Sequence, residues 1–342
     1  MSGFFVVNGL RLSCCKFNLV VMTMSLERQP CPGLGSTRKR SCSGLESFVP
    51  FLVLVYSPGQ LLLRTIGSAC KIHFLVDLPV LTINLNTHSG DSYTQTGFLT
   101  NLTLPSPGNP LGNPAYPGYT ATGGANWLDF DTTTYNNSLV LTYNYAYGGA
   151  TIDSGLVAPF EPTVLSVTDQ VNEFLDTAAS KPASTPWTSE SSLFSIWIGI
   201  NDLGNSYYLS DNRTSFDTTL LNADDVGARN FLFLNVPPTD RSPLMLAQST
   251  EAQEMLKANI LDFNSQLVEF IDEFKASNSG VTTFLWDANA AFTTILDDPT
   301  AYGFIDAVSY GTDVGYFWIS CSGPANVYWA EGVADVLSGS IW

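Results

Sequence analysis

Three short segments carry side chains suited to acyl transfer. They read SGDSY at residues 89–93, NYAYGGA at residues 144–150 and GIND at residues 199–202. Ser92 is lifted out of an apolar run by a small-residue turn, which makes it a candidate nucleophile for an ester carbonyl. The tetrahedral intermediate then needs donors for its oxyanion. A glycine N–H, the Ser92 N–H and an asparagine amide would provide them without a charge to be neutralised.

Each of these residues also has a purely structural interpretation. Gly148 and Gly149 would permit a tight exit from a strand, Asn201 would cap a turn, and Ser92 would cap the following helix. Three such segments in chain order favour the chemical interpretation. The sequence has no GxSxG elbow, no phosphate-binding glycine loop, no GxGxxG after a strand and no metal-spaced His/Cys cluster, so we expect neither a cofactor nor a metal.

The three segments follow predicted strands. Near-continuous runs of β-branched and aromatic residues, typical of strands covered on both faces, occupy residues 79–86, 138–145, 193–200, 230–236 and 281–287. Strands that alternate with helices predict an α/β fold, a three-layer α/β/α sandwich with a five-stranded, mostly parallel sheet. Each segment would then lie at the carboxyl edge of that sheet, where open α/β sheets bind their ligands.

Helical spacing is expected between these strands. It is clearest over residues 251–275, where one stripe contains Leu256, Ile260, Phe263, Leu267, Phe270 and Phe274. Weaker patterns cover residues 164–179 and 325–337. Only residues 215–225 remain for the crossover between the third and fourth strands, so we expect a stunted helix there.

The charge is unevenly distributed along the 342 residues. Residues 1–72 contain 8 of the 14 basic and 2 of the 31 acidic residues, which gives them a net charge of +6. The remainder has 6 basic and 29 acidic residues and a net charge of −23. A surface so acidic repels phosphate backbones, which argues against nucleic acid as a partner and favours neutral or polyhydroxylated ligands.

The N-terminal segment differs in other ways too. It holds five of the six cysteines, so no disulfide framework is expected in the rest of the chain. No standard signal peptide begins at Met1, but RKR at residues 38–40 and the apolar residues 48–56 have the order of a signal's regions, displaced inward. Pro50 and Pro58 argue against a membrane-spanning helix. Glycosylation acceptors that fit a secreted protein occur at Asn101, Asn136 and Asn212.

Together, GDSY, NYAYGGA and GIND resemble the first three blocks of the SGNH/GDSL hydrolase superfamily, whose fold is flavodoxin-like. The stretches PGNPLGNPAYPGYTATGGANWLDF and NFLFLNVPPTDRSP are similar to secreted fungal acetylesterases of carbohydrate esterase family 16. The resemblance implies that Ser92 is the nucleophile and that Gly149 and Asn201 complete the oxyanion hole. It also implies that Asp91 and Asp202 support these residues.

The fourth block of the family is not preserved. These enzymes take their general base from a C-terminal Asp-x-x-His-Pro, where this chain reads FWISCSGP at residues 317–324. An alignment without a gap puts Ser320 at the aspartate and Gly323 at the histidine, and neither accepts a proton at neutral pH. Of the two histidines, His73 lies in the unmatched N-terminal part. His88, at the expected strand exit, would have to fold back over its own turn to reach Ser92.

The resemblance divides the chain into residues 1–72, unlike the family and expected to be disordered or misannotated, and an ester hydrolase domain at residues 73–342. It implies deacetylation of plant-wall oligosaccharides outside the cell, with the activity nearly abolished by the lost base. Wrongly joined exons would account for the leader, the short crossover and the lost base, and sequencing the transcript would test that hypothesis.

Two alternatives remain open for the function. One is a non-catalytic protein that keeps a sugar cleft and only binds, and the other is an esterase or lipase for non-carbohydrate esters. The aromatic residues considered for sugar contacts are Trp127, Tyr207 and Tyr208, for which packing in the core is the alternative.

Overall fold

The computed structural model describes residues 7–14, 17–24, 51–57, 60–65, 74–77, 83–209, 226–311, 315–318 and 324–338. Contacts divide the chain into Met1–Leu81 and Thr82–Trp342. The first unit contains one antiparallel sheet with its strands in chain order, β1 (Val7–Cys14), β2 (Phe17–Met24), β3 (Phe51–Ser57), β4 (Gln60–Thr65) and β5 (Phe74–Asp77). The boundary expected after residue 72 falls within this first unit.

The second unit is built on a five-stranded sheet in which every neighbouring pair is parallel. The strand order is β10-β9-β8-β6-β7. The strands are β6 (Ile83–Gly90), β7 (Leu139–Asn144), β8 (Ser192–Trp197), β9 (Asn230–Leu234) and β10 (Thr282–Trp286). The expected α/β fold with a five-stranded parallel sheet is therefore confirmed.

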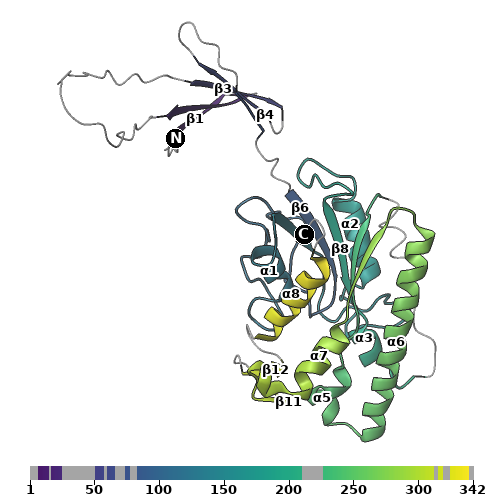
Figure 1. Cartoon of the computed structure of the whole chain (residues 1–342). Coiled ribbons are helices and arrows are strands. Elements are labelled where there is room, and N and C mark those ends of the chain that lie inside the picture. Colours follow the sequence, from purple (N-terminus) through teal and green to yellow (C-terminus); the bar gives the residue numbers. More distant parts are fainter. Residues whose placement is uncertain are drawn as a thin grey trace, which may run out of the picture. The chain divides into compact units, whose positions relative to one another are not determined.

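Helices cover both faces of this sheet (Figure 1). One face packs against α2 (Val167–Thr177), α3 (Ile200–Gly204) and α6 (Thr250–Ser277). The other packs against α1 (Trp127–Thr133), α7 (Ala288–Asp297) and α8 (Pro324–Leu337). Shorter elements complete the unit, namely η1 (Thr239–Arg241), α5 (Pro243–Leu246), η2 (Pro299–Tyr302), and the parallel pair β11 (Asp306–Tyr310) and β12 (Tyr316–Trp318).

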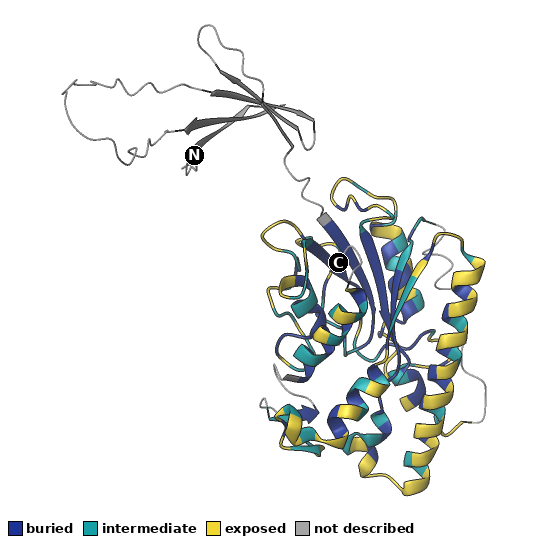
Figure 2. Cartoon of the chain, in the orientation of Figure 1, coloured by how far each residue is buried: buried dark blue, intermediate teal, exposed yellow. Residues whose placement is uncertain are grey.

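The central strands are buried on both sides because their neighbours and the helices exclude water from both faces (Figure 2). In β9, Phe231 and Leu232 point to opposite faces, join different apolar clusters and are both fully buried. This is the two-sided environment in which parallel strands read as near-continuous apolar runs.

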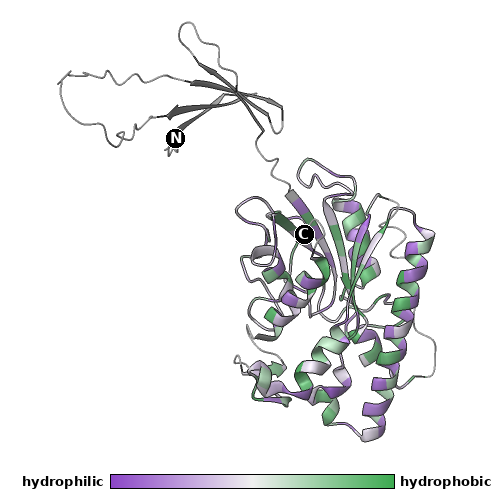
Figure 3. Ribbon diagram, viewed as in Figure 1, coloured by the Kyte–Doolittle hydropathy of each residue, from purple (hydrophilic) through white to green (hydrophobic). Residues whose placement is uncertain are grey.

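Helix α6 shows how one apolar stripe fixes a helix on the sheet. Its buried side chains recur every three or four residues and include Leu256, Ile260, Phe263, Leu267, Ile271 and Phe274. Apolar and polar residues accordingly alternate around the helix (Figure 3). The stripe matches the prediction except at one turn, where Ile271 is buried and the neighbouring Phe270 is only partly so.

The first strand of the sheet ends four residues later than predicted. The sequence favoured residues 79–86, with His88 at the strand exit, but β6 runs from Ile83 to Gly90 and His88 lies inside it. The prediction ended the strand too early because Thr87, His88, Ser89 and Gly90 interrupt the apolar pattern and read as a turn. His88 fits within the strand because the strand is paired on both edges and the His88 Nδ1 is hydrogen-bonded to Ser195 Oγ on the neighbouring strand.

The order of the strands brings the three segments together. The chain runs from β6 to β7 on one side of β6, and then to β8 on the other side. Because the strands are parallel, Ser92, Gly149 and Asn201 follow the carboxyl ends of three adjacent strands, at the point where the strand order reverses. Open α/β sheets place their ligand sites at such a point.

Two other expectations concern the connections. The stunted crossover helix at residues 215–225 lies outside the described residues. Of the helices in the described part of the chain, none combines the length and the apolar character that crossing a membrane requires.

Substitution of the stripe on α6 tests this packing. Leu267→Ala removes a side chain that is 3% exposed, and we expect a loss of about 2–5 kcal/mol in the free energy of unfolding, because a cavity forms. Leu261→Ala, on the same helix at 54% exposure, is the matched control and should change it by less than about 0.5 kcal/mol. Urea unfolding measures both, and equal losses would contradict this arrangement.

Candidate active site

The Ser92 turn is held from below by α2. The Gly90 N–H donates to Gln170 Oε1 at 2.8 Å, and Gln170 Nε2 donates back to the Gly90 carbonyl at 2.9 Å. The turn continues with Asp91, whose carbonyl accepts from the N–H groups of Thr94 and Gln95. A side chain at residue 90 would lie 2.5 Å from the Trp197 carbonyl of β8, so the close approach of these strands requires glycine.

The glycine pair after β7 begins next to the serine. A Cβ at Gly148 would lie 3.8 Å from Ser92 Cβ and would displace the end of the Gln95 side chain, so the two segments approach each other closely. Gly149 adopts a φ of +83°, which favours glycine. Within the described residues, the N–H groups of Ser92, Gly148 and Gly149 make no hydrogen bond, which leaves them available as donors.

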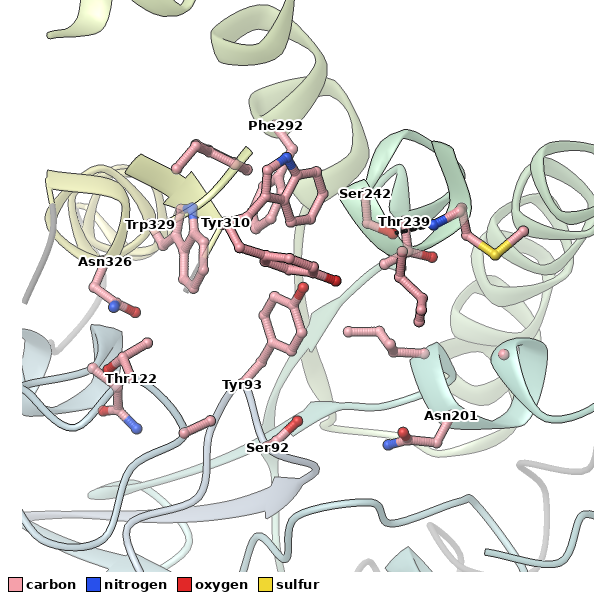
Figure 4. Close-up of a pocket in the computed structure, with 18 of the residues that line it drawn as sticks. Ser92, Tyr93, Thr122, Asn201, Thr239, Ser242, Phe292, Tyr310, Asn326 and Trp329 are labelled. Carbon is pink, nitrogen blue, oxygen red and sulfur yellow. Dashed lines mark hydrogen bonds between the residues drawn. The ribbon is translucent and has the colours of Figure 1, made fainter. Parts of the chain in front are cut away.

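Asn201 approaches the same point from the end of β8. Its amide nitrogen donates to the Ala150 carbonyl at 2.9 Å, which uses one of its two hydrogens and orients the other. Figure 4 shows the Asn201 amide and the Ser92 hydroxyl pointing toward one another at one side of a cavity. The structure therefore brings Ser92, Gly149 and Asn201 together, in an arrangement able to bind an oxyanion.

Two buried carboxyl groups lie behind these residues. Asp91 Oδ1 accepts from the Tyr93 N–H at 2.9 Å, and Asp202 Oδ1 accepts from the Ile152 N–H at 3.0 Å, which ties the start of α3 to the chain after Gly149. Within the described part of the chain, the Oδ2 atom of each accepts no hydrogen bond. Burial raises the pKa of both groups from 3.8 to about 7, and repulsion by Asp202 contributes to the raised pKa of Asp91.

The cavity above Ser92 has a volume of about 430 Å³, within the range of small-molecule sites. Its described lining comes from the Ser92 turn, the loop at Thr120–Thr122, α3, α5, α6, α7, β11, β12 and α8. No histidine, lysine, arginine, aspartate or glutamate is among these described lining residues. The site is therefore neutral and suited to uncharged ligands, because a buried unpaired charge is costly.

The aromatic wall of the cavity differs from the one considered from the sequence. Trp127 is 1% exposed and lies in the core between α1 and the sheet, so it packs in the core and does not face a ligand in the Ser92 cavity. Tyr207 is partly buried against the other core, Tyr208 is 63% exposed, and neither lines the cavity. The aromatic lining residues are instead Tyr93, Phe292, Tyr310, Phe317, Trp318 and Trp329. In the sequence, the pair Phe317-Trp318 resembles the family pattern, and it was the signal that could have identified this wall.

His88 is separated from Ser92. It is 2% exposed, its Nδ1 is hydrogen-bonded to Ser195 Oγ, and its ring packs edge-to-face on Trp127. With Asp131 it lines a second, smaller cavity of about 120 Å³ that does not include Ser92. Burial lowers the pKa of His88 from 6.5 to about 3, so the ring is neutral and forms part of the core.

The next residues concern the aspartate and histidine positions expected from the family pattern. Ser320, Gly323 and His73 lie outside the described residues. Trp318 and Asn326, the described lining residues on either side of the first two, both contact the Ser92 cavity. No group of three His, Cys, Asp or Glu side chains that could hold a metal ion is found in the part of the chain that the structure describes.

A serine at the exit of a central parallel strand, close to an amide and free backbone donors, is the arrangement of an α/β hydrolase that cleaves esters. The chain belongs to the GDSL-like Lipase/Acylhydrolase family, whose profile matches residues 88–318. It is thus related to hydrolases that act on ester bonds.

The chain is also similar to individual proteins. An acetylesterase of Thermothelomyces thermophilus is 41% identical over 265 residues, which cover 74% of this chain and 88% of that protein. A thermolabile hemolysin of Vibrio parahaemolyticus is 27% identical over 230 residues, or 66% of this chain and 50% of that protein. Among solved structures, an acetyl xylan esterase of Geobacillus stearothermophilus has a TM-score of 0.42 at 12% identity and covers 76% of this chain and 96% of its own.

The buried carboxyl groups predict a pH dependence of stability. Between about pH 4 and pH 7 the folded protein keeps a proton on Asp202 that the unfolded chain releases, so stability falls as the pH rises. The expected slope is up to about 1.4 kcal/mol per pH unit for one group. Asp202→Asn cannot titrate and can still accept from the Ile152 N–H, so the slope should become shallower. Urea unfolding across this range measures it, and an unchanged slope would contradict the assignment.

Proposed function

We propose that this chain is a secreted carbohydrate acetylesterase by descent, with Ser92 as its nucleophile and with its activity strongly weakened by the loss of the general base. The observation that carries the proposal is the neutral cavity, which joins Ser92 and Asn201 and has no proton acceptor of suitable pKa among its described lining residues. The relative named acetylesterase, which is 41% identical, supports the acetyl group as the acyl part.

In the proposed reaction, Ser92 Oγ attacks the acetyl carbonyl carbon. The carbonyl oxygen becomes an oxyanion and accepts hydrogen bonds from the N–H groups of Ser92 and Gly149 and from the second Asn201 amide hydrogen. Collapse of the intermediate releases the sugar hydroxyl and leaves an acetyl-serine, and water then releases acetate. Asp91 and Asp202 act as positioning residues, because they hold the backbone on which the donors lie.

Both steps require a group that takes a proton, first from Ser92 and then from water. The family supplies a histidine at the position of Gly323, and His88 faces another cavity. A serine hydrolase without its histidine keeps the catalysis that its oxyanion hole and its binding provide, about 10³–10⁴-fold over water. We therefore expect slow but measurable acetate release.

Secretion and glycosylation belong to the same proposal. Asn101 is exposed and Asn136 is partly exposed, so the first of these acceptors is the more accessible. Asn212 lies outside the described residues. Carbohydrate at Asn101 would be detected by peptide mass spectrometry of the protein secreted from a eukaryotic host.

Restoring the catalytic pair tests the proposed chemistry. In the double variant Ser320→Asp and Gly323→His, a base is placed where the family has one, and we expect acetate release from acetylated xylo-oligosaccharides to rise by at least about 10³-fold. The measurement is enzymatic detection of acetate at matched protein concentrations. Adding Ser92→Ala to the double variant should abolish the gain.

Each outcome separates the proposal from its alternatives. Full activity of the unmodified chain would show that a base lies elsewhere. No activity in either form, combined with sugar binding that survives Ser92→Ala, would favour the non-catalytic binding protein. A rescued enzyme that prefers long acyl chains would favour a lipase.

A further inference from the structure

Asn326 is a buried amide without a partner in the cavity wall. It lies in the first turn of α8 and is 2% exposed, yet its side chain makes no hydrogen bond with any described residue. The other asparagines that line the cavity, Asn126, Asn201 and Asn205, each donate to a backbone carbonyl. A buried polar group is normally paired, so Asn326 differs from the other three asparagines of the cavity and needs an explanation.

A second unpaired polar atom lies one turn along the same helix. The indole Nε1 of Trp329 is buried and has no hydrogen-bond partner among the residues that the structure describes. Residues three apart lie on one face of a helix, and both Asn326 and Trp329 line the cavity, where Figure 4 shows them side by side. The Trp329 ring is held in place, because it stacks on Phe292 at 4.7 Å and on Tyr93 at 5.6 Å. These two contacts fix the orientation of the indole in the cavity wall.

The chemistry of this wall restricts what it can bind. The amide offers an acceptor and donors, and the indole offers a donor, which together match hydroxyl groups that both donate and accept. No charged side chain is found among the described lining residues, so an ionic ligand would be buried without a partner. An apolar alcohol would fill the space but leave the amide unpaired, which is costly.

We propose that Asn326 and the Trp329 N–H form a subsite for the hydroxyl groups of the alcohol half of the ester, so that the cavity selects a sugar over an apolar alcohol of the same size. The inference rests on the proposed function, because it assumes that the Ser92 cavity is the ester site. It names the residues that determine specificity, and it places them on α8, opposite the Asn201 side of the cavity (Figure 4).

The test compares two acetate esters in the Ser92→Ala background, where no turnover can occur. The probes are a monoacetylated methyl xyloside and cyclohexyl acetate, which share the acetyl group and the ring size but differ in hydroxyl groups. Titration calorimetry gives their affinities for the full chain with and without Asn326→Leu, a nearly isosteric change. We expect the variant to bind the xyloside about tenfold more weakly and cyclohexyl acetate at least as tightly.

Two further variants exclude damage to the fold. Trp329→Phe keeps a six-membered aromatic ring but removes the N–H together with the rest of the indole, so cyclohexyl acetate is its control: the xyloside should be weakened more than cyclohexyl acetate. Asn326→Leu should not lower the melting temperature of the ligand-free protein, because no hydrogen bond is lost. Asn264→Leu is the matched contrast, since Asn264 pairs with both the N–H and the carbonyl of Val236, and it should lower the melting temperature.

The outcomes distinguish this inference from the proposed function. Equal weakening of both probes by Asn326→Leu, or a melting temperature lowered as far as by Asn264→Leu, would overturn the subsite. A selective loss for the xyloside would support it even if the rescued enzyme releases no acetate. In that case the cavity binds sugars and the proposed hydrolysis fails independently.

Discussion

The site depends on the parallel pairing of β6 with β7 on one edge and with β8 on the other. Leu85 faces Leu141 across one edge and Ser192 across the other, so the register of three strands is fixed by a single central one. The exits of these strands must then meet, and the residues that follow them lie within reach of one another. The reciprocal hydrogen bonds of Gln170 with Gly90 extend this constraint to the helix layer.

Burial has opposite consequences on the two sides of the Ser92 turn. Below it, the carboxyl groups of Asp91 and Asp202 are kept away from water and their pKa values rise to about 7, so they serve as neutral or shared acceptors for backbone N–H groups. Above it, the cavity is apolar and neutral, with amide and indole groups as its polar features. The described lining of the cavity contains no group that could accept the proton of Ser92. The donors of the oxyanion hole do not depend on such a group.

Much of this architecture follows from the sequence because parallel strands and amphipathic helices leave strong patterns. The runs at β9 and β10 and the stripe of α6 were predicted within a few residues. The end of β6 was misplaced because Thr87, His88 and Ser89 look like a loop when their partners on other elements are unknown. The wall of the cavity could not be predicted either, because Tyr93, Phe292 and Trp329 meet only through tertiary packing.

The stack of Trp329 on Tyr93 and Phe292 has a further consequence for how this protein can be studied. Indole emission responds to the polarity and hydration of its surroundings, and two of the chain's seven tryptophans, Trp318 and Trp329, line the cavity. A ligand that displaces water from this wall would change the spectrum of these two fluorophores. The protein thus contains an intrinsic optical reporter of occupancy that needs neither a label nor a chemical reaction.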